Sequence, residues 1–86
     1  MIQIRNSIRS ILMAHWDPIG VRDEPGAANE YEPYLAGLSR LLDQAASAAE
    51  IATHLLKIER AEMGLPGDAP RAERTAKLLT DLRTGP

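Results

Sequence analysis

The chain lacks cysteine and phenylalanine altogether, and holds only one tryptophan and two tyrosines among its 86 residues. Without cysteine there is no disulfide framework, no thiolate zinc site and no cysteine nucleophile, so stability must come from packing or from a partner. A chain of this length supports one domain with a single small core. These absences exclude disulfide-stabilised proteins, proteins with cysteine-bound zinc and enzymes with a cysteine nucleophile, but they do not indicate an activity.

Long apolar runs and an excess of one charge are also missing. The longest apolar run covers Ile11 to Ala14, whereas a membrane helix needs roughly 20 residues and a secretory leader an apolar stretch of about 7 to 15. We therefore expect a cytoplasmic protein with no membrane contact. The formal charge of -2 offers no general attraction for nucleic-acid phosphates, so we expect no nucleic-acid partner.

Apolar residues recur three and four positions apart along most of the chain, and no stretch shows the alternation of a β-strand. We predict an all-α fold, a small bundle of three to four helices with a long ordered loop between the first and the second. The pattern places helices over about residues 2–16, 33–44 and 48–63, with a weaker fourth in the tail. Residues 1–65 are expected to form the helical domain, and residues 66–86 a C-terminal helix or tail that packs on it.

Caps and prolines define the helix boundaries. Ser47 with Glu50 three residues later forms a capping box for the third helix, and Gly64 is its C-terminal cap. The second helix has two possible starts. Asn29 begins another capping-box pattern, whereas Pro33 suits the first helical position because its missing N–H has no partner there. We favour the start at Pro33.

The connection between the first two helices is the most acidic part of the chain. Its residues Asp17 to Gly20 have the preferences of a type I turn, and Glu24-Pro25-Gly26 those of a type II turn. Residues 17–32 hold five acidic residues against one arginine. This region is either a surface that attracts a basic protein or a solvated loop beside a helix N-terminus, where carboxylates are favoured.

All the aromatic residues flank this acidic connection. Tryptophan and tyrosine dominate interface hot spots, but in a chain without phenylalanine they can equally be the large pieces of the core. Both interpretations stay open at this point. The candidate partner-binding residues are Trp16, Asp17, Glu30, Tyr31, Glu32 and Tyr34.

Two pairs of side chains could bind a metal or exchange protons, namely His15 with Asp17 and His54 with Glu50. Two ligands do not make a metal site, and the sequence has no glycine-rich phosphate loop, nucleophile elbow or calcium loop. We therefore predict no catalytic residue, no metal and no cofactor. The alternative is a small-ligand or metal-binding enzyme with a pocket at His15, Asp17 and Tyr31.

One set of motifs resembles a family of small bacterial proteins of unknown function. The motifs are the turn His15-Trp16-Asp17-Pro18-Ile19-Gly20-Val21, then Glu30-Tyr31 with Tyr34, Leu41-Leu42, Glu50-Ile51, Leu55, Ile58-Glu59 and Met63-Gly64-Leu65. The resemblance covers residues 8–65 and departs from the family pattern at Pro33, in a segment where the family usually has Asp after the tyrosine. It implies a compact helical domain in a bacterial cytoplasm, and it supplies no activity, catalytic residue or cofactor.

The function predicted from these features is a non-enzymatic protein–protein interaction module. Its acidic, aromatic region would contact a protein partner or a second copy of the chain. A related version of this prediction is an immunity-type or regulatory protein that blocks a basic partner with its acidic edge. Self-association is a further expectation, because short domains without disulfides or metals often complete their packing in this way.

Overall fold

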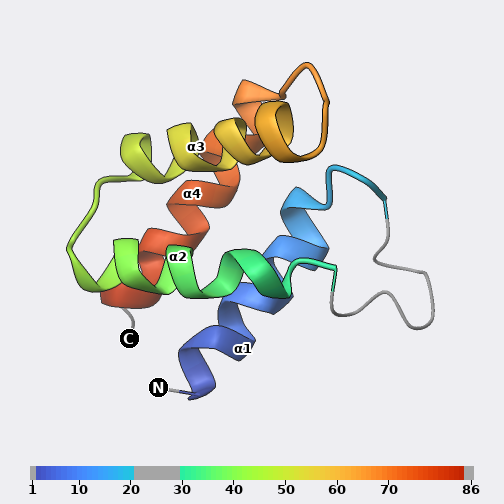
Figure 1. The fold of residues 1–86 in the computed structure, drawn as a ribbon. Helices are drawn as coiled ribbons and strands as arrows, with labels where there is room; N and C mark the ends of the chain where they lie inside the picture. The colour runs from blue at the N-terminus through green and yellow to red at the C-terminus, as the bar shows by residue number, and fades with distance from the viewer. Residues whose placement is uncertain (1, 21–29, 85–86) are drawn as a thin grey trace.

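The computed structural model describes residues 2–20 and 30–84, and every element in these ranges is helical (Figure 1). The elements are α1 (Ile2–Ile11), η1 (Leu12–Trp16), α2 (Glu32–Asp43), α3 (Ala48–Lys57), η2 (Ile58–Glu62) and α4 (Ala69–Thr84). The predicted all-α bundle is confirmed. Most of the long connection, including the predicted turn at Glu24-Pro25-Gly26 and the alternative cap at Asn29, lies outside the described residues.

The first and third helices both end in a π-helical turn, η1 and η2. Backbone hydrogen bonds of the i to i+5 type mark them, from Asp17 N to Leu12 O at 2.8 Å and from Met63 N to Ile58 O at 3.1 Å. The predicted span of residues 2–16 is therefore helical throughout, but its last turn is wider than the expected α-helix. Such wide turns are rare and occur where a local packing or functional need outweighs regular α geometry.

The predicted caps are largely confirmed. Ser47 Oγ accepts a hydrogen bond from Glu50 N at 3.1 Å, and Glu50 Oε1 accepts one from Ser47 N at the same distance, which completes the capping box. Gly64 has a φ of +67°, as a C-terminal glycine cap requires. The second helix begins one residue earlier than expected, at Glu32, so Pro33 takes the second helical position. A proline is tolerated there because N–H groups of the first turn have no intrahelical acceptor.

The tail, expected to be the weakest helix, is the longest one and the most central. Helix α4 has 16 residues and packs against α3, η1, α1 and α2. Its Ala72, Ala76 and Leu79 are fully buried, and the two alanines let the neighbouring backbones come close. The Asp68 side chain starts this helix, because its Oδ1 accepts a hydrogen bond from Arg71 N at 3.0 Å.

The core runs through the whole bundle, and all described elements contribute to it. Trp16 and Tyr31 are its largest members, and aliphatic side chains from α1, α2 and α3 surround them. The buried apolar residues are Ile8, Leu12, Trp16, Tyr31, Leu35, Leu38, Leu42, Ala46, Ile51, Ala52, Leu55, Ile58, Ala72, Ala76 and Leu79. None of the helices within the described ranges combines the length and the apolar character needed to cross a bilayer.

Replacing Leu79 with alanine tests whether α4 is an integral part of this core. We expect Leu79→Ala to lower the free energy of unfolding by about 2–5 kcal/mol, because it removes a fully buried side chain. Urea denaturation, followed by the fluorescence of the single tryptophan, measures the change. Lys77→Ala, at an exposed position on the same helix, should cost less than about 0.5 kcal/mol. Equal effects of the two substitutions would contradict the docked position of α4.

Candidate functional site

The three aromatic side chains of the chain meet in one cluster. The ring centroids of Trp16 and Tyr31 lie 5.3 Å apart with an interplanar angle of 54°. Those of Trp16 and Tyr34 lie 6.3 Å apart with the rings nearly perpendicular, at 89°. Tilted and edge-to-face pairs of this kind are the favoured arrangements of aromatic rings, and each adds about 0.5–1.5 kcal/mol to the burial term.

The six candidate partner-binding residues divide between the interior and the surface. The side chains of Trp16 and Tyr31 are 1% and 0% exposed, so these two residues belong to the core. Asp17 and Tyr34 are half-buried. Glu30 and Glu32 are exposed, although Glu32 Oε2 accepts a hydrogen bond from Arg9 Nε at 2.6 Å. Only the last four can present atoms to a partner while the fold stays intact.

The turn that follows Trp16 is held to the aromatic cluster by one hydrogen bond. The Tyr31 hydroxyl donates to Asp17 Oδ1 at 2.7 Å, and Gly20 N closes the predicted turn by donating to Asp17 O at 3.1 Å. Asp17 itself has a φ of 32°, a left-handed conformation that aspartate tolerates better than most residues. Burial, and then the hydrogen bond with Asp17, raises the pKa of the Tyr31 hydroxyl, so Tyr31 remains a donor across the physiological range.

A buried carboxylate lies beneath the cluster. Glu59 is fully buried, and its Oε2 accepts a hydrogen bond from Trp16 Nε1 at 3.0 Å. Its Oε1 accepts two more, from Asp68 N at 3.1 Å and from Arg71 Nη2 at 3.2 Å. A buried charge is tolerated only when it is paired and hydrogen-bonded, and Glu59 meets both conditions. Its role in the described structure is to join three chain segments.

Neither Glu59 nor Arg71 was among the residues singled out as a site, although the sequence carries a signal for Glu59. Ile51, Leu55 and Glu59 follow one another at intervals of four, so a carboxylate continues the apolar stripe of the third helix. A charged residue on a buried stripe needs a buried partner. Spacing alone does not identify that partner, because Trp16 lies 43 residues away in the sequence.

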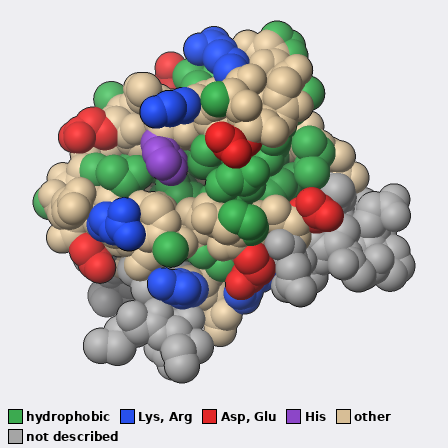
Figure 2. Space-filling model, viewed as in Figure 1, with side chains coloured by type: hydrophobic (Ala, Val, Ile, Leu, Met, Phe, Trp, Pro, Cys, Tyr) green, Lys and Arg blue, Asp and Glu red, His purple; other side chains and the backbone are tan. Residues whose placement is uncertain are grey.

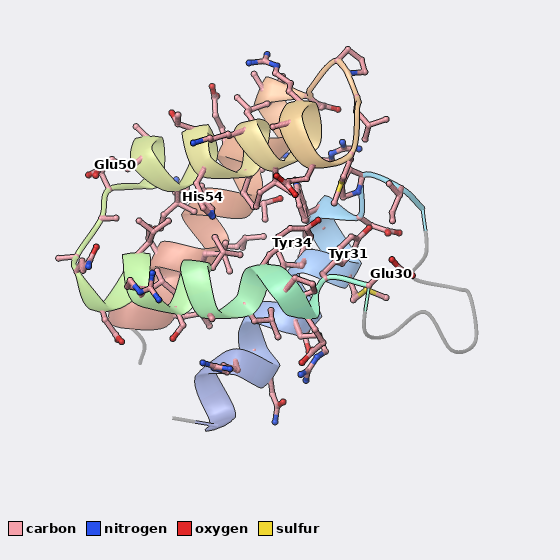
Figure 3. All side chains as sticks on the ribbon, viewed as in Figure 1. Glu30, Tyr31, Tyr34, Glu50 and His54 are labelled. Atoms are coloured by element: carbon pink, nitrogen blue, oxygen red, sulfur yellow. The ribbon has the colours of Figure 1, made fainter. Side chains whose placement is uncertain are left out.

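An open groove lies between α2 and the helical unit formed by α3 and η2. It has a volume of about 260 Å³ and is lined by Pro33, Tyr34, Gly37, His54, Lys57, Ile58 and Glu62. Figure 2 shows hydrophobic side chains gathered over this space, beside a histidine and within a border of charged groups. In Figure 3, Tyr34 extends from α2 and His54 from α3 on the two sides of the groove, with Glu50 toward one end.

The side chain of His54 lies against the backbone of α2. A Cβ added at Gly37 would be 3.6 Å from His54 Nε2, which is an ordinary van der Waals contact. The imidazole is half-buried, and this burial, followed by the nearby positive charge of Lys57, lowers the pKa of His54. At neutral pH the groove therefore contains an uncharged imidazole.

The metal pairs considered from the sequence gain no further ligands. In residues 2–20 and 30–84, no three histidine or acidic side chains come together as a metal site would require. His15 is exposed, while Glu50 is engaged in the capping box. The Tyr31 hydroxyl expected to line a small-ligand pocket is buried and bound to Asp17.

A scan against protein-family models and searches of curated proteins and of solved structures found no match to this chain. The resemblance to small bacterial proteins stays a prediction from the motifs quoted above.

Replacing Glu59 with glutamine tests the buried hydrogen-bond centre. We expect Glu59→Gln to lower the free energy of unfolding by about 1–3 kcal/mol. The substitution replaces one carboxylate oxygen, which accepts a hydrogen bond, with an amide NH2 group, which is itself a donor. Urea denaturation followed by Trp16 fluorescence measures the loss. Glu62→Gln, an exposed change in the same π-helical turn, should stay within about 0.5 kcal/mol. If the two variants are equally stable, Glu59 does not hold the segments together.

The pH dependence of stability tests the environment of His54. Its lowered pKa means that the unfolded chain binds a proton at a pH where the folded chain does not, so stability falls as the pH drops below about 6.5. The free energy of unfolding should decrease less between pH 7.0 and 5.5 in His54→Gln than in the unmodified chain. The control is His15→Gln, at an exposed position, and a decrease unaltered by His54→Gln would contradict the assignment.

Proposed function

We propose that this chain is a non-enzymatic protein–protein interaction module, which binds its partner in the groove between α2 and α3–η2. One observation carries the proposal. Two amphipathic helices joined by the short segment 44–47 would normally pack directly on each other at about 8–10 Å, but α2 and α3 are not among the closely packed helix pairs. The apolar surfaces of Tyr34 and Ile58 border the groove instead.

Charged groups on the groove wall support a protein partner. Lys57 and Glu62 are exposed, and neither forms an ion pair with another residue of the described ranges. Charges at the rim of an apolar surface accelerate docking and select partners, since complementary potentials steer the encounter. An apolar groove with free charges of both signs on one wall suits a protein surface with a matching pattern.

The candidate residues from the sequence keep a place in this proposal, with divided roles. Tyr34 is the member that lines the groove, and Glu30 and Glu32 are exposed just before it in the chain. Trp16 and Tyr31 act from the interior, because they pack beneath the surface and Trp16 contacts the Tyr34 ring. An immunity-type or regulatory role remains part of the proposal. Glu32 is paired with Arg9, so the charges that the groove wall offers to a partner are those of Lys57 and Glu62.

Photo-crosslinking in cells that naturally encode the chain tests this function. Lys57→p-benzoylphenylalanine places a photoreactive group on the groove wall, and the same change at Lys77, exposed on α4, is the matched control. We expect a discrete adduct of higher mass from position 57 and none from position 77. An adduct of twice the chain mass would make a second copy the partner. No adduct from position 57, or equal adducts from both positions, would overturn the proposal.

A further inference from the structure

We infer that the occupant of the groove is an amphipathic α-helix of a protein partner, with a basic and an acidic residue about one turn apart on one flank. This inference rests on the proposed function and names the chemistry of its partner. Three observations carry the inference: the form of the two walls, the unpaired charges of the described residues along one wall, and the poor fit of a second copy.

The walls favour a helix over an extended segment. Both walls are helical, so they provide no strand edge for an incoming strand. An extended peptide lying there would bring its own backbone groups into an apolar groove without partners, which costs free energy for each group. A helix satisfies its backbone internally and presents only side chains.

The dimensions of the walls agree with this geometry. On the α2 side, Pro33, Tyr34 and Gly37 line the groove, and Leu41 lines a neighbouring hollow that shares His54 and Lys57 with it. From residue 33 to residue 41 the helix rises about 12 Å. That distance matches roughly two turns of a partner helix, enough for apolar anchors at i, i+3 or i+4, and i+7. Gly37 lies midway along this wall, and the imidazole of His54 lies against it.

Charge complementarity defines the flank of the partner. Lys57 and Glu62 lie on the same wall, five residues apart, which is about one turn of the π-helical segment η2. A basic residue opposite Glu62 and an acidic residue opposite Lys57 would then be about four positions apart in the partner helix, where the rise is about 6 Å. The α2 wall is lined by Pro33, Tyr34 and Gly37, which carry no charge, so the other flank is expected to be apolar or small.

A second copy of the chain fits this groove poorly. Ile19 is the exposed large hydrophobic residue of the described ranges, at 42%, and it lies on a turn. The described helices therefore present no exposed stripe of large apolar side chains to insert. Two such grooves facing each other would be concave against concave, which leaves the apolar walls uncovered.

A phage-displayed library of random 16-residue peptides tests the inference with the full chain as target. Selection uses the unmodified chain, with counter-selection against Gly37→Gln. This change adds a side chain beside His54 on the groove wall, and glutamine has a higher helix propensity than glycine. Ala36→Gln, at an exposed position one residue earlier, is the matched control. We expect peptides with a helical apolar stripe and the two flanking charges, and at least tenfold weaker binding to Gly37→Gln than to Ala36→Gln.

Charge exchange with the best synthetic peptide completes the test. Lys57→Glu or Glu62→Lys alone should weaken binding about threefold to fivefold, as for exposed ion pairs, and reversal of the matching peptide charge should restore it. These exposed changes keep the inference testable if Gly37→Gln fails to fold. Groove-dependent peptides that bind while extended, or that ignore the charges, would overturn the helical partner but leave the interaction module. The absence of any groove-dependent peptide would argue against both.

Discussion

The burial of one carboxylate, that of Glu59, is the constraint on which the packing of the described chain depends. Its oxygens receive donors from Trp16 at the end of η1, from the backbone of Asp68 and from Arg71 at the start of α4. The loss of one of these donors would leave the buried carboxylate with fewer hydrogen bonds, which costs more for a charged group than for a neutral one. The end of η1, 43 residues away, and the start of α4 must therefore both meet η2 at Glu59. Both Trp16 and Glu59 lie in π-helical turns, where the widened backbone coincides with their contact.

The aromatic residues take their roles from this arrangement. Once Trp16 is bound to Glu59, its ring forms a surface on which Tyr31 and Tyr34 pack. Tyr31 is enclosed and fixes the following turn through Asp17, whereas Tyr34 reaches the groove. All three aromatic residues of the chain thus lie in one cluster. Tyr34 contacts both the interior, through the Trp16 ring, and the groove.

The groove follows from the way the helices pair. Helix α3 packs chiefly on α4, while α2 packs on α1, and the exposed Arg9–Glu32 ion pair adds a weak contact between α1 and the start of α2. Since α2 and α3 belong to different pairs, the two consecutive helices are not closely packed on each other, and the groove lies between them, with His54 of α3 against Gly37 of α2 (Figure 1). The groove that we propose as the binding site therefore results from the way in which the helices pair to form the core.

The sequence by itself determined the helical class, the buried faces and the caps at Ser47 and Gly64, because these depend on residues within about four positions of one another. It placed the start of α2 within one residue, and it brought the aromatic and acidic residues to attention without deciding which were buried. The central position of α4, the partners of Glu59 and the groove were decided only by the tertiary structure. An alanine-rich helix has a weak pattern of its own, and a hydrogen bond across 43 residues has no local signal, so both depend on which helices finally pack together.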